Sequence, residues 1–256
     1  MPRTVVWLLL GATLLPASSL PAGAADGPSL TVYGAADLAF AFKELTPIFE
    51  KASGVQVSLS LGSTGNLAAQ IENGAPADVF FAADQSFVDR LVGRGALIAE
   101  TRTLYARGRI VLATPRSAGR KLANLQDLLD PDVRRIAIAN PLHAPYGKAA
   151  EEAMRNLGLW DTLKPKLIYG ENVRQALQFV QVGAVDAGIV ALSVARVPEI
   201  EWAMIDSTLH APLNQVAAVV TRSRRPDLAT SFIRFVAGAE GRPIMKKYGF
   251  LLPGEF

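Results

Sequence analysis

The sequence contains no cysteine and only two histidines among its 256 residues. The absence of cysteine excludes a disulfide framework, a thiolate metal cluster, a cysteine nucleophile and a lipid-anchored amino-terminal cysteine. The two histidines, His143 and His210, do not have the spacing of a metal site, so we expect no residue that ligates a metal cation. An excess of one charge is missing too, because 26 Lys and Arg stand against 23 Asp and Glu, a net charge of +3. Nucleic-acid binding requires clustered basic residues and is therefore not expected.

The chain also lacks the short motifs that identify common enzymes. It has no Gly-x-x-x-x-Gly-Lys-Ser/Thr phosphate loop, no strand-linked Gly-x-Gly-x-x-Gly, no Gly-x-Ser-x-Gly and no His-Glu-x-x-His. The run Gly93-Arg94-Gly95 is better explained as the end of a helix than as a phosphate loop. We therefore expect a protein that is not an enzyme, with no catalytic residue and no cofactor.

The amino terminus has the composition of a secretory signal peptide. Arg3 precedes an apolar run from Val5 to Leu15, and the segment ends in small residues up to Ala24. The apolar run is too short for a membrane span, which needs about 20 residues. We predict that residues 1–24 are cleaved and that the mature protein is soluble in the periplasm. An amino-terminal membrane anchor is the alternative.

The mature chain alternates strand patterns with helix patterns, which predicts an α/β fold built from βαβ units with mostly parallel sheets. In the first helix, Asp37 is placed to cap the first turn, Pro47 is expected to kink or shift the helix, and Gly54 to end it. The spacing favours two lobes joined by short strands over two domains in series. Strands are predicted at 30–34, 55–61, 78–82, 109–113, 136–139, 167–169, 188–190 and 215–220, and further helices at 67–72, 147–157, 173–182, 227–236 and 241–247.

Short turns of small residues separate several strand ends from the helices that follow. They lie at 34–37, 62–66, 143–147 and 170–173. In open α/β sheets, ligands bind beyond the carboxyl ends of the strands, where free N–H groups and the positive ends of helix dipoles favour an anion. Ser63 and Thr64 add hydroxyl donors and Tyr146 adds a phenol, whereas no Arg or Lys adjoins the 62–66 turn. Ordinary turns and caps are the alternative for any one of the four, but together they predict an anion-binding cleft.

Five stretches of the sequence resemble the periplasmic molybdate-binding proteins of ABC importers, over about residues 30–250. The two most specific are 70–84 (QIENGAPADVFFAAD) and 157–167 (LGLWDTLKPKL); the others are 32–38, 171–176 and 247–250. The resemblance implies a two-lobe periplasmic-binding fold of type II, with lobe I formed by 25–108 and 212–256 and lobe II by 109–211. It also implies a monomer that closes on molybdate, with tungstate indistinguishable, and delivers it to a membrane permease.

The resemblance also implies a set of ligand-binding residues. A first loop, which usually offers a serine hydroxyl and an N–H group, corresponds to Ala36 and Asp37. A second, serine-rich loop corresponds to Ser63 and Thr64, and backbone donors fall at Tyr146 and Val173. Many members carry a tyrosine where this chain has Ala191, and others place it on the third loop, where Tyr146 stands.

Two departures from this pattern leave the ligand open. Ala36 lacks the usual hydroxyl, and a charge-assisted hydrogen bond is worth about 1.5–3 kcal/mol. Asp37 either caps a helix and points away, or faces the cleft and accepts a proton from a protonated, phosphate-like oxyanion. A third hypothesis is an exported enzyme of similar fold that depends on His143.

Overall fold

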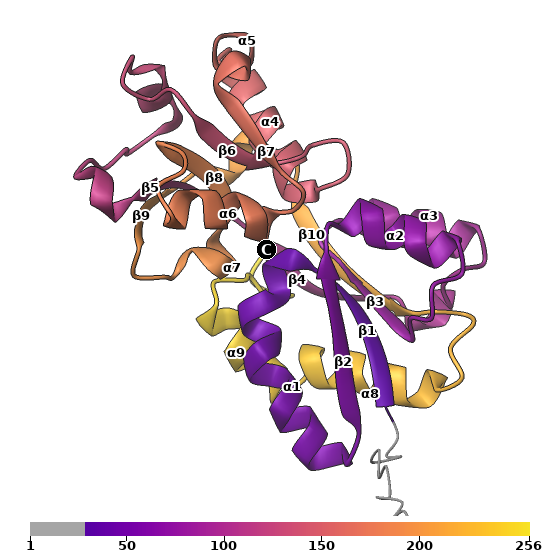
Figure 1. The fold of residues 1–256 in the computed structure, drawn as a ribbon. Helices are drawn as coiled ribbons and strands as arrows, with labels where there is room; N and C mark the ends of the chain where they lie inside the picture. Colours follow the sequence, from indigo (N-terminus) through magenta and orange to yellow (C-terminus); the bar gives the residue numbers. More distant parts are fainter. Residues whose placement is uncertain (1–28) are drawn as a thin grey trace, which may run out of the picture.

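The computed structural model describes residues 29–256 as two α/β lobes, each built on one five-stranded sheet (Figure 1). The predicted signal peptide lies outside the described residues. The sheet of lobe I has the order β2 (Gln56–Gly62), β1 (Ser29–Ala35), β3 (Val79–Ala82), β10 (Leu213–Val219), β4 (Thr103–Gly108). The sheet of lobe II has the order β7 (Leu167–Gly170), β6 (Ile136–Ala139), β8 (Ala187–Ala191), β5 (Ile110–Pro115), β9 (Ile200–Met204).

The two-lobe α/β class is confirmed, whereas the strand pairing is mixed rather than mostly parallel. In lobe I, β1 pairs in parallel with β2 and β3, and β10 pairs antiparallel with β3 and β4. In lobe II, β6 pairs in parallel with β7 and β8, and β5 pairs antiparallel with β8 and β9. The antiparallel strands arise because the chain crosses between lobes, from β4 to β5 through Arg109 and back from β9 to β10. The predicted residue boundaries of the lobes stay a prediction.

The helices cover both sheets and bury their apolar faces against them. Lobe I carries α1 (Ala39–Ser53), α2 (Thr64–Glu72), α3 (Gln85–Gly93), α8 (Pro226–Ala237) and α9 (Gly241–Lys247). Lobe II carries α4 (Pro145–Asn156), α5 (Trp160–Leu163), α6 (Val173–Gln181) and α7 (Leu192–Ala195). Short 3₁₀ helices occur at Ala36–Leu38 (η1), Ala99–Thr101, Arg116–Ala118, Leu125–Leu129, Lys164–Lys166 and Ser207–Leu209. No helix among residues 29–256 is long and apolar enough to cross a membrane.

The first helix illustrates how local sequence sets the element bounds. Gly54 ends α1 in the left-handed conformation at φ 70°, which glycine adopts at no steric cost. Pro47 lies inside α1 without ending it. On the buried face of this helix, Phe42 packs edge-to-face on Phe81 and Phe232, with ring centroids 5.1 and 5.7 Å away. These aromatic contacts fix α1 and α8 on the same face of the lobe I sheet.

Candidate functional site

A small cavity lies between the two lobes, at the carboxyl ends of β1 and β2 and at the start of several helices. The cavity has a volume of about 10 Å³, enough for about one water molecule. The site therefore excludes an organic molecule, and a tetrahedral oxyanion would enter it only if the two lobes moved slightly apart. Its lining residues are Ala35, Ala36, Asp37, Gly62, Ser63, Thr64, Ala83, Ala144, Pro145, Tyr146, Asn172 and Val173. These include all six predicted ligand-binding residues, and Asp37 is the only carboxylate among them.

Three helices, α2, α4 and α6, begin at this cavity, two from lobe II and one from lobe I. The side chain of Ser63 caps α2 by accepting from Asn66 N–H, and that of Asn172 caps α6 by accepting from Arg174 and Gln175 N–H. Helix α4 has Pro at its first position, which carries no N–H group. In α2 and α6 these caps use later N–H groups, so the N–H group of the first helical residue is not used. In α4 the first N–H group belongs to the second helical residue. None of these three N–H groups has a partner among the described residues.

These N–H groups belong to Thr64, Tyr146 and Val173, all of which line the cavity. The first N–H groups of a helix have no intrahelical acceptor, and the helix dipole makes this end positive. No Lys or Arg is among the residues that line the cavity. An anion bound here would be held by neutral donors and helix dipoles.

Two hydroxyls add to these donors. Thr64 Oγ1 accepts from Ala83 N–H at 3.1 Å, so its own proton remains to donate. Ser63 Oγ accepts from Asn66 N–H and lies 2.8 Å from His143 Nδ1, across the boundary between the lobes. Ser63 therefore has two competing acceptors for its one proton: the imidazole, in one tautomer, and a bound anion.

Asp37 lies in η1 and its carboxylate is completely buried, so the prediction that it caps a helix and points away is wrong. The residue that caps η1 is Ala35 and the one that caps α1 is Leu38, neither with a side-chain hydrogen bond. Asp37 Oδ2 instead accepts from Tyr146 Oη at 2.8 Å and from Gln215 Nε2 at 2.5 Å. Burial raises the pKa of the carboxyl from 3.8 to about 6, although these two hydrogen bonds and the residue's own backbone N–H oppose the rise.

The Tyr146 hydroxyl is occupied by this carboxylate. Burial and the neighbouring Asp37 raise its pKa well above its usual value, so it stays protonated and donates. Its one proton goes to Asp37 Oδ2, while its oxygen accepts from Gln215 Nε2 at 3.0 Å. The predicted phenol donor is therefore not available to a ligand, whereas the Tyr146 backbone N–H is.

The sequence did not indicate Gln215 or Tyr105, which complete this network. Tyr105 Oη donates to Gln215 Oε1 at 2.8 Å, which orients the amide nitrogen toward Asp37. Both residues are buried on strands of lobe I, β10 and β4, and both lie far along the chain from Asp37. The only sequence signal for Gln215 was a polar residue within an apolar strand pattern, and Tyr105 had none because its strand was not predicted.

Other candidate residues lie elsewhere. Ala191 is buried at the end of β8, paired with Ile110, and is not among the residues that line the cavity. His210 is buried with its Nδ1 2.8 Å from the carbonyl of Ala211. Within residues 29–256, no group of three or more His, Asp or Glu side chains is placed to hold a metal ion.

The lobes touch at the entrance to the cavity. Gly65 N–H donates to the carbonyl of His143 at 2.8 Å, and Ser193 Oγ donates to the carbonyl of Asp37 at 2.8 Å. A Cβ on Gly65 would lie 2.7 Å from the His143 oxygen and 3.0 Å from its Cα. Only glycine at this position allows the α2 backbone to approach lobe II so closely.

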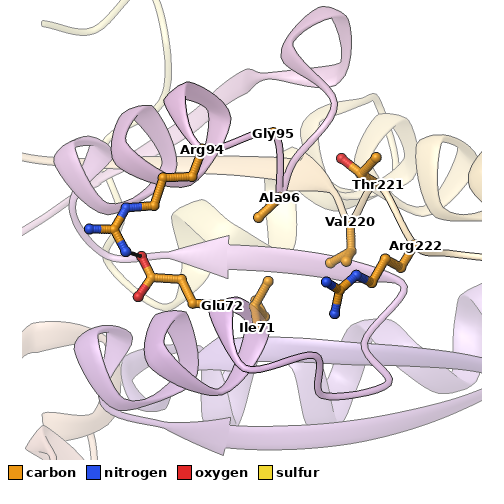
Figure 2. A pocket seen from close by; sticks show the side chains of 8 residues that line it. All are labelled: Ile71, Glu72, Arg94, Gly95, Ala96, Val220, Thr221 and Arg222. Atoms are coloured by element: carbon orange, nitrogen blue, oxygen red, sulfur yellow. Dashed lines mark ion pairs between the residues drawn. The ribbon is translucent and has the colours of Figure 1, made fainter.

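A larger cavity of about 340 Å³ lies within lobe I, between the ends of α2 and α3 and the segment after β10 (Figure 2). Glu72 and Arg94 form an ion pair of 3.1 Å there, and Arg222 lies on the other side. Arg94 is largely exposed, and none of the predicted site residues lines this cavity. It lacks the converging helix ends of the interlobe cavity, so we regard the latter as the functional site.

Comparison with known proteins agrees with this architecture. A family model of bacterial extracellular solute-binding proteins matches residues 30–251, and the chain belongs to this family. The molybdate-binding protein ModA of Azotobacter vinelandii is 34% identical over 247 residues, 94% of each chain. ModA of Escherichia coli is 34% identical over 238 residues, 89% of this chain and 91% of its own. A putative ABC transporter substrate-binding lipoprotein of Bacillus subtilis is 31% identical, over 87% of this chain and 86% of its own.

The fold of the chain is also similar to the folds of solved structures. The periplasmic molybdate-binding protein of Azotobacter vinelandii matches with a TM-score of 0.81 and 32% identity, over 88% of this chain and 99% of its own. The sulfate-binding protein SubI of Mycobacterium tuberculosis matches with a TM-score of 0.78 but only 18% identity, over 88% of this chain and 87% of its own, and shows the fold alone. The predicted resemblance to molybdate-binding proteins is confirmed, and these relatives are binding proteins, not enzymes.

Proposed function

We propose that this protein captures molybdate in the periplasm and delivers it to the membrane permease of an ABC importer. Three helix-start N–H groups without a partner among residues 29–256, at Thr64, Tyr146 and Val173, converge on one small cavity between the lobes, and this observation carries the proposal. The similarity to two molybdate-binding proteins at 34% identity supports molybdate as the anion. Tungstate has the same charge and shape and is expected to bind as well.

Binding would proceed by closure of the two lobes around the desolvated dianion. Lobe I contributes Ser63, Thr64 and the Ala36–Asp37 turn, and lobe II contributes Tyr146 and Val173. Because the anion bridges both sets of donors, it would stabilise the closed arrangement in which Gly65 contacts His143. The permease can then distinguish the liganded binding protein from the free binding protein by its shape.

Selectivity against sulfate would follow from the size of the cavity in the liganded form, since N–H and O–H donors do not distinguish two dianions by charge. The predicted signal peptide and the absence of cysteine support a freely diffusing protein without a lipid anchor. The expectation that it is a monomer rests on the resemblance to the family alone. The second hypothesis, a protonated phosphate-like ligand, retains one supporting observation, the buried Asp37 carboxylate beside the cavity.

Calorimetric titration of the purified mature protein with molybdate, tungstate, sulfate and phosphate tests the proposal. We expect tight binding of molybdate and tungstate and weak binding of sulfate. A thermal-shift panel provides an independent readout, because a ligand at 100 times its Kd stabilises the folded state by about 2.7 kcal/mol. Tight binding of sulfate or phosphate without any response to molybdate would refute it.

A further inference from the structure

The two oxygens of the Asp37 carboxyl have different environments. Oδ2 accepts two hydrogen bonds, from Tyr146 and Gln215. Oδ1 is buried and has no hydrogen-bond partner among the described residues. A buried carboxylate oxygen without a donor is costly, so an unpartnered Oδ1 on a residue that lines the ligand cavity requires an explanation.

The surrounding network allows a proton on only one of the two oxygens. The Tyr146 hydroxyl stays protonated and donates to Oδ2, and Tyr105 holds the Gln215 amide so that its nitrogen also faces Oδ2. With two donors already directed at Oδ2, an added proton has no room there. A neutral Asp37 therefore carries its proton on Oδ1, where the carboxyl becomes a donor.

No neighbouring charge offsets a carboxylate at this position. The elements that pack most closely against η1 are α1, α6, α7 and β2, and α4 and β10 reach Asp37 through Tyr146 and Gln215. Strand β10 carries no charged residue, and the nearest charged side chain of α4, Lys148, is exposed. Neither α7 nor β2 carries a charged residue, and the nearest charged side chain of α1, Lys43, is exposed. Arg174 on α6 has its guanidinium over the ring of Phe40, 4.4 Å from the centroid. The groups that face Asp37 directly, Tyr146 and Tyr105, are both neutral because their pKa values are raised well above 10.

A dianion in the cavity would stand next to this carboxyl with no cation between them. Like charges that share a buried site force one of the groups to take up a proton. Molybdate has no proton of its own near neutral pH, so the proton must come from solvent and go to Asp37. A neutral carboxyl then changes from a repulsive neighbour into a hydrogen-bond donor.

We propose, on the basis of the proposed function, that Asp37 is protonated on Oδ1 whenever the oxyanion is bound, so that capture of each dianion takes up one proton. Asp37 is then a specificity-determining residue that favours fully deprotonated dianions. It replaces the donor that Ala36 lacks, and it makes affinity depend on pH although the ligand does not titrate.

Calorimetric titration with molybdate in buffers of different ionisation enthalpy, between pH 6.5 and 8.5, measures the proton uptake directly. We expect uptake to approach one proton per bound molybdate, with a Kd that rises by up to about tenfold per pH unit. Asp37→Asn is the matched variant, because its amide keeps an oxygen for Tyr146 and Gln215 and presents an N–H donor in place of the Oδ1 proton. We expect no proton uptake in this variant, a Kd independent of pH, and an affinity at pH 8 that equals or exceeds that of the wild type.

Tyr146→Phe provides a second test that keeps the carboxyl. Because the tyrosine hydroxyl stabilises the ionised form, its removal raises the pKa of Asp37 further and shifts the proton uptake to higher pH. Molybdate binding without proton uptake in the wild type overturns this inference and leaves the proposed function standing. A preference for hydrogen phosphate over molybdate at pH 8 also overturns it, since Asp37 would then accept the proton of the ligand. Failure to bind molybdate at any pH overturns both.

Discussion

The contact between Gly65 and His143 makes lobe closure testable with a single methyl group. In Gly65→Ala, the new Cβ would lie 2.7 Å from the His143 carbonyl oxygen and 3.0 Å from its Cα and Cβ. These atoms belong to the other lobe, and two of the three are backbone atoms that cannot rotate away. Gly65 lies inside α2 without a positive φ, so alanine suits the lobe itself.

The size of the expected loss in molybdate affinity follows from two effects that exist only in the closed arrangement of the lobes. Overpacking of this kind costs about 1–3 kcal/mol, and separating the lobes breaks the 2.8 Å bond from Gly65 N–H, worth about 0.5–1.5 kcal/mol. Closure is therefore disfavoured by about 1.5–4.5 kcal/mol, which weakens molybdate binding by about tenfold to about a thousandfold.

Calorimetric titration measures the affinity, and small-angle scattering with and without molybdate measures closure. We expect a higher Kd and a smaller ligand-dependent compaction, while the melting temperature without ligand stays the same or rises. Gly93→Ala is the control, because it is also a helical glycine and a Cβ there meets no atom within 4 Å. Wild-type affinity in Gly65→Ala would refute the conclusion that the closed contact is part of the binding equilibrium.

Three further predictions concern single groups at the site. Thr64→Val removes a hydroxyl while keeping the shape of the side chain. We expect molybdate affinity, measured by calorimetry, to fall by about one to two decades, because a charge-assisted hydrogen bond worth about 1.5–3 kcal/mol is lost. An unchanged Kd would show that the hydroxyl does not contact the anion. Asn172→Ala removes the α6 cap, which accepts hydrogen bonds of 3.0 and 3.1 Å from Arg174 and Gln175 N–H. We expect urea denaturation to show a free energy of unfolding lower by about 1 kcal/mol. An unchanged free energy of unfolding would contradict the capping role. The raised pKa of Asp37, about 6 against 3.8, stabilises the fold fully below pH 4, and this contribution of about 3 kcal/mol is lost as pH rises through 6. Melting curves of the wild type and Asp37→Asn should therefore diverge in this window, and parallel curves would contradict the burial of an ionisable Asp37.

Local patterns predicted most of the elements, and non-local pairing accounts for what they missed. The strand Ile136–Ala139 and the helix Gly241–Lys247 have the predicted bounds, because apolar runs and glycine punctuation define them locally. The strand β4 was not predicted, and of the helix α3 only the end at Gly93-Arg94-Gly95 was, although Asp84 caps α3 and Val88 and Leu91 give it a buried face. The direction of β10 depends on strands more than a hundred residues away, so no local pattern contains it.

The same distinction between local and non-local signals applies to the site. The small-residue turns predicted where helix starts converge, and the structure places all six predicted residues around one cavity; their role as ligands stays a prediction. The environment of Asp37 was not predictable, because the side chain that orients it, Gln215, lies 178 residues away in the sequence. The local interpretation of an acidic residue before a helix, a cap, was wrong because tertiary contacts determined its position.

The most direct test of the account is a crystal structure of the mature protein grown with molybdate, with data collected at the molybdenum absorption edge. We expect one anomalous peak in the interlobe cavity, with oxygens about 2.7–3.2 Å from the backbone nitrogens of Thr64, Tyr146 and Val173. A peak in the cavity beside Glu72 and Arg222 instead, or an interlobe cavity that stays empty at saturating molybdate, would contradict it.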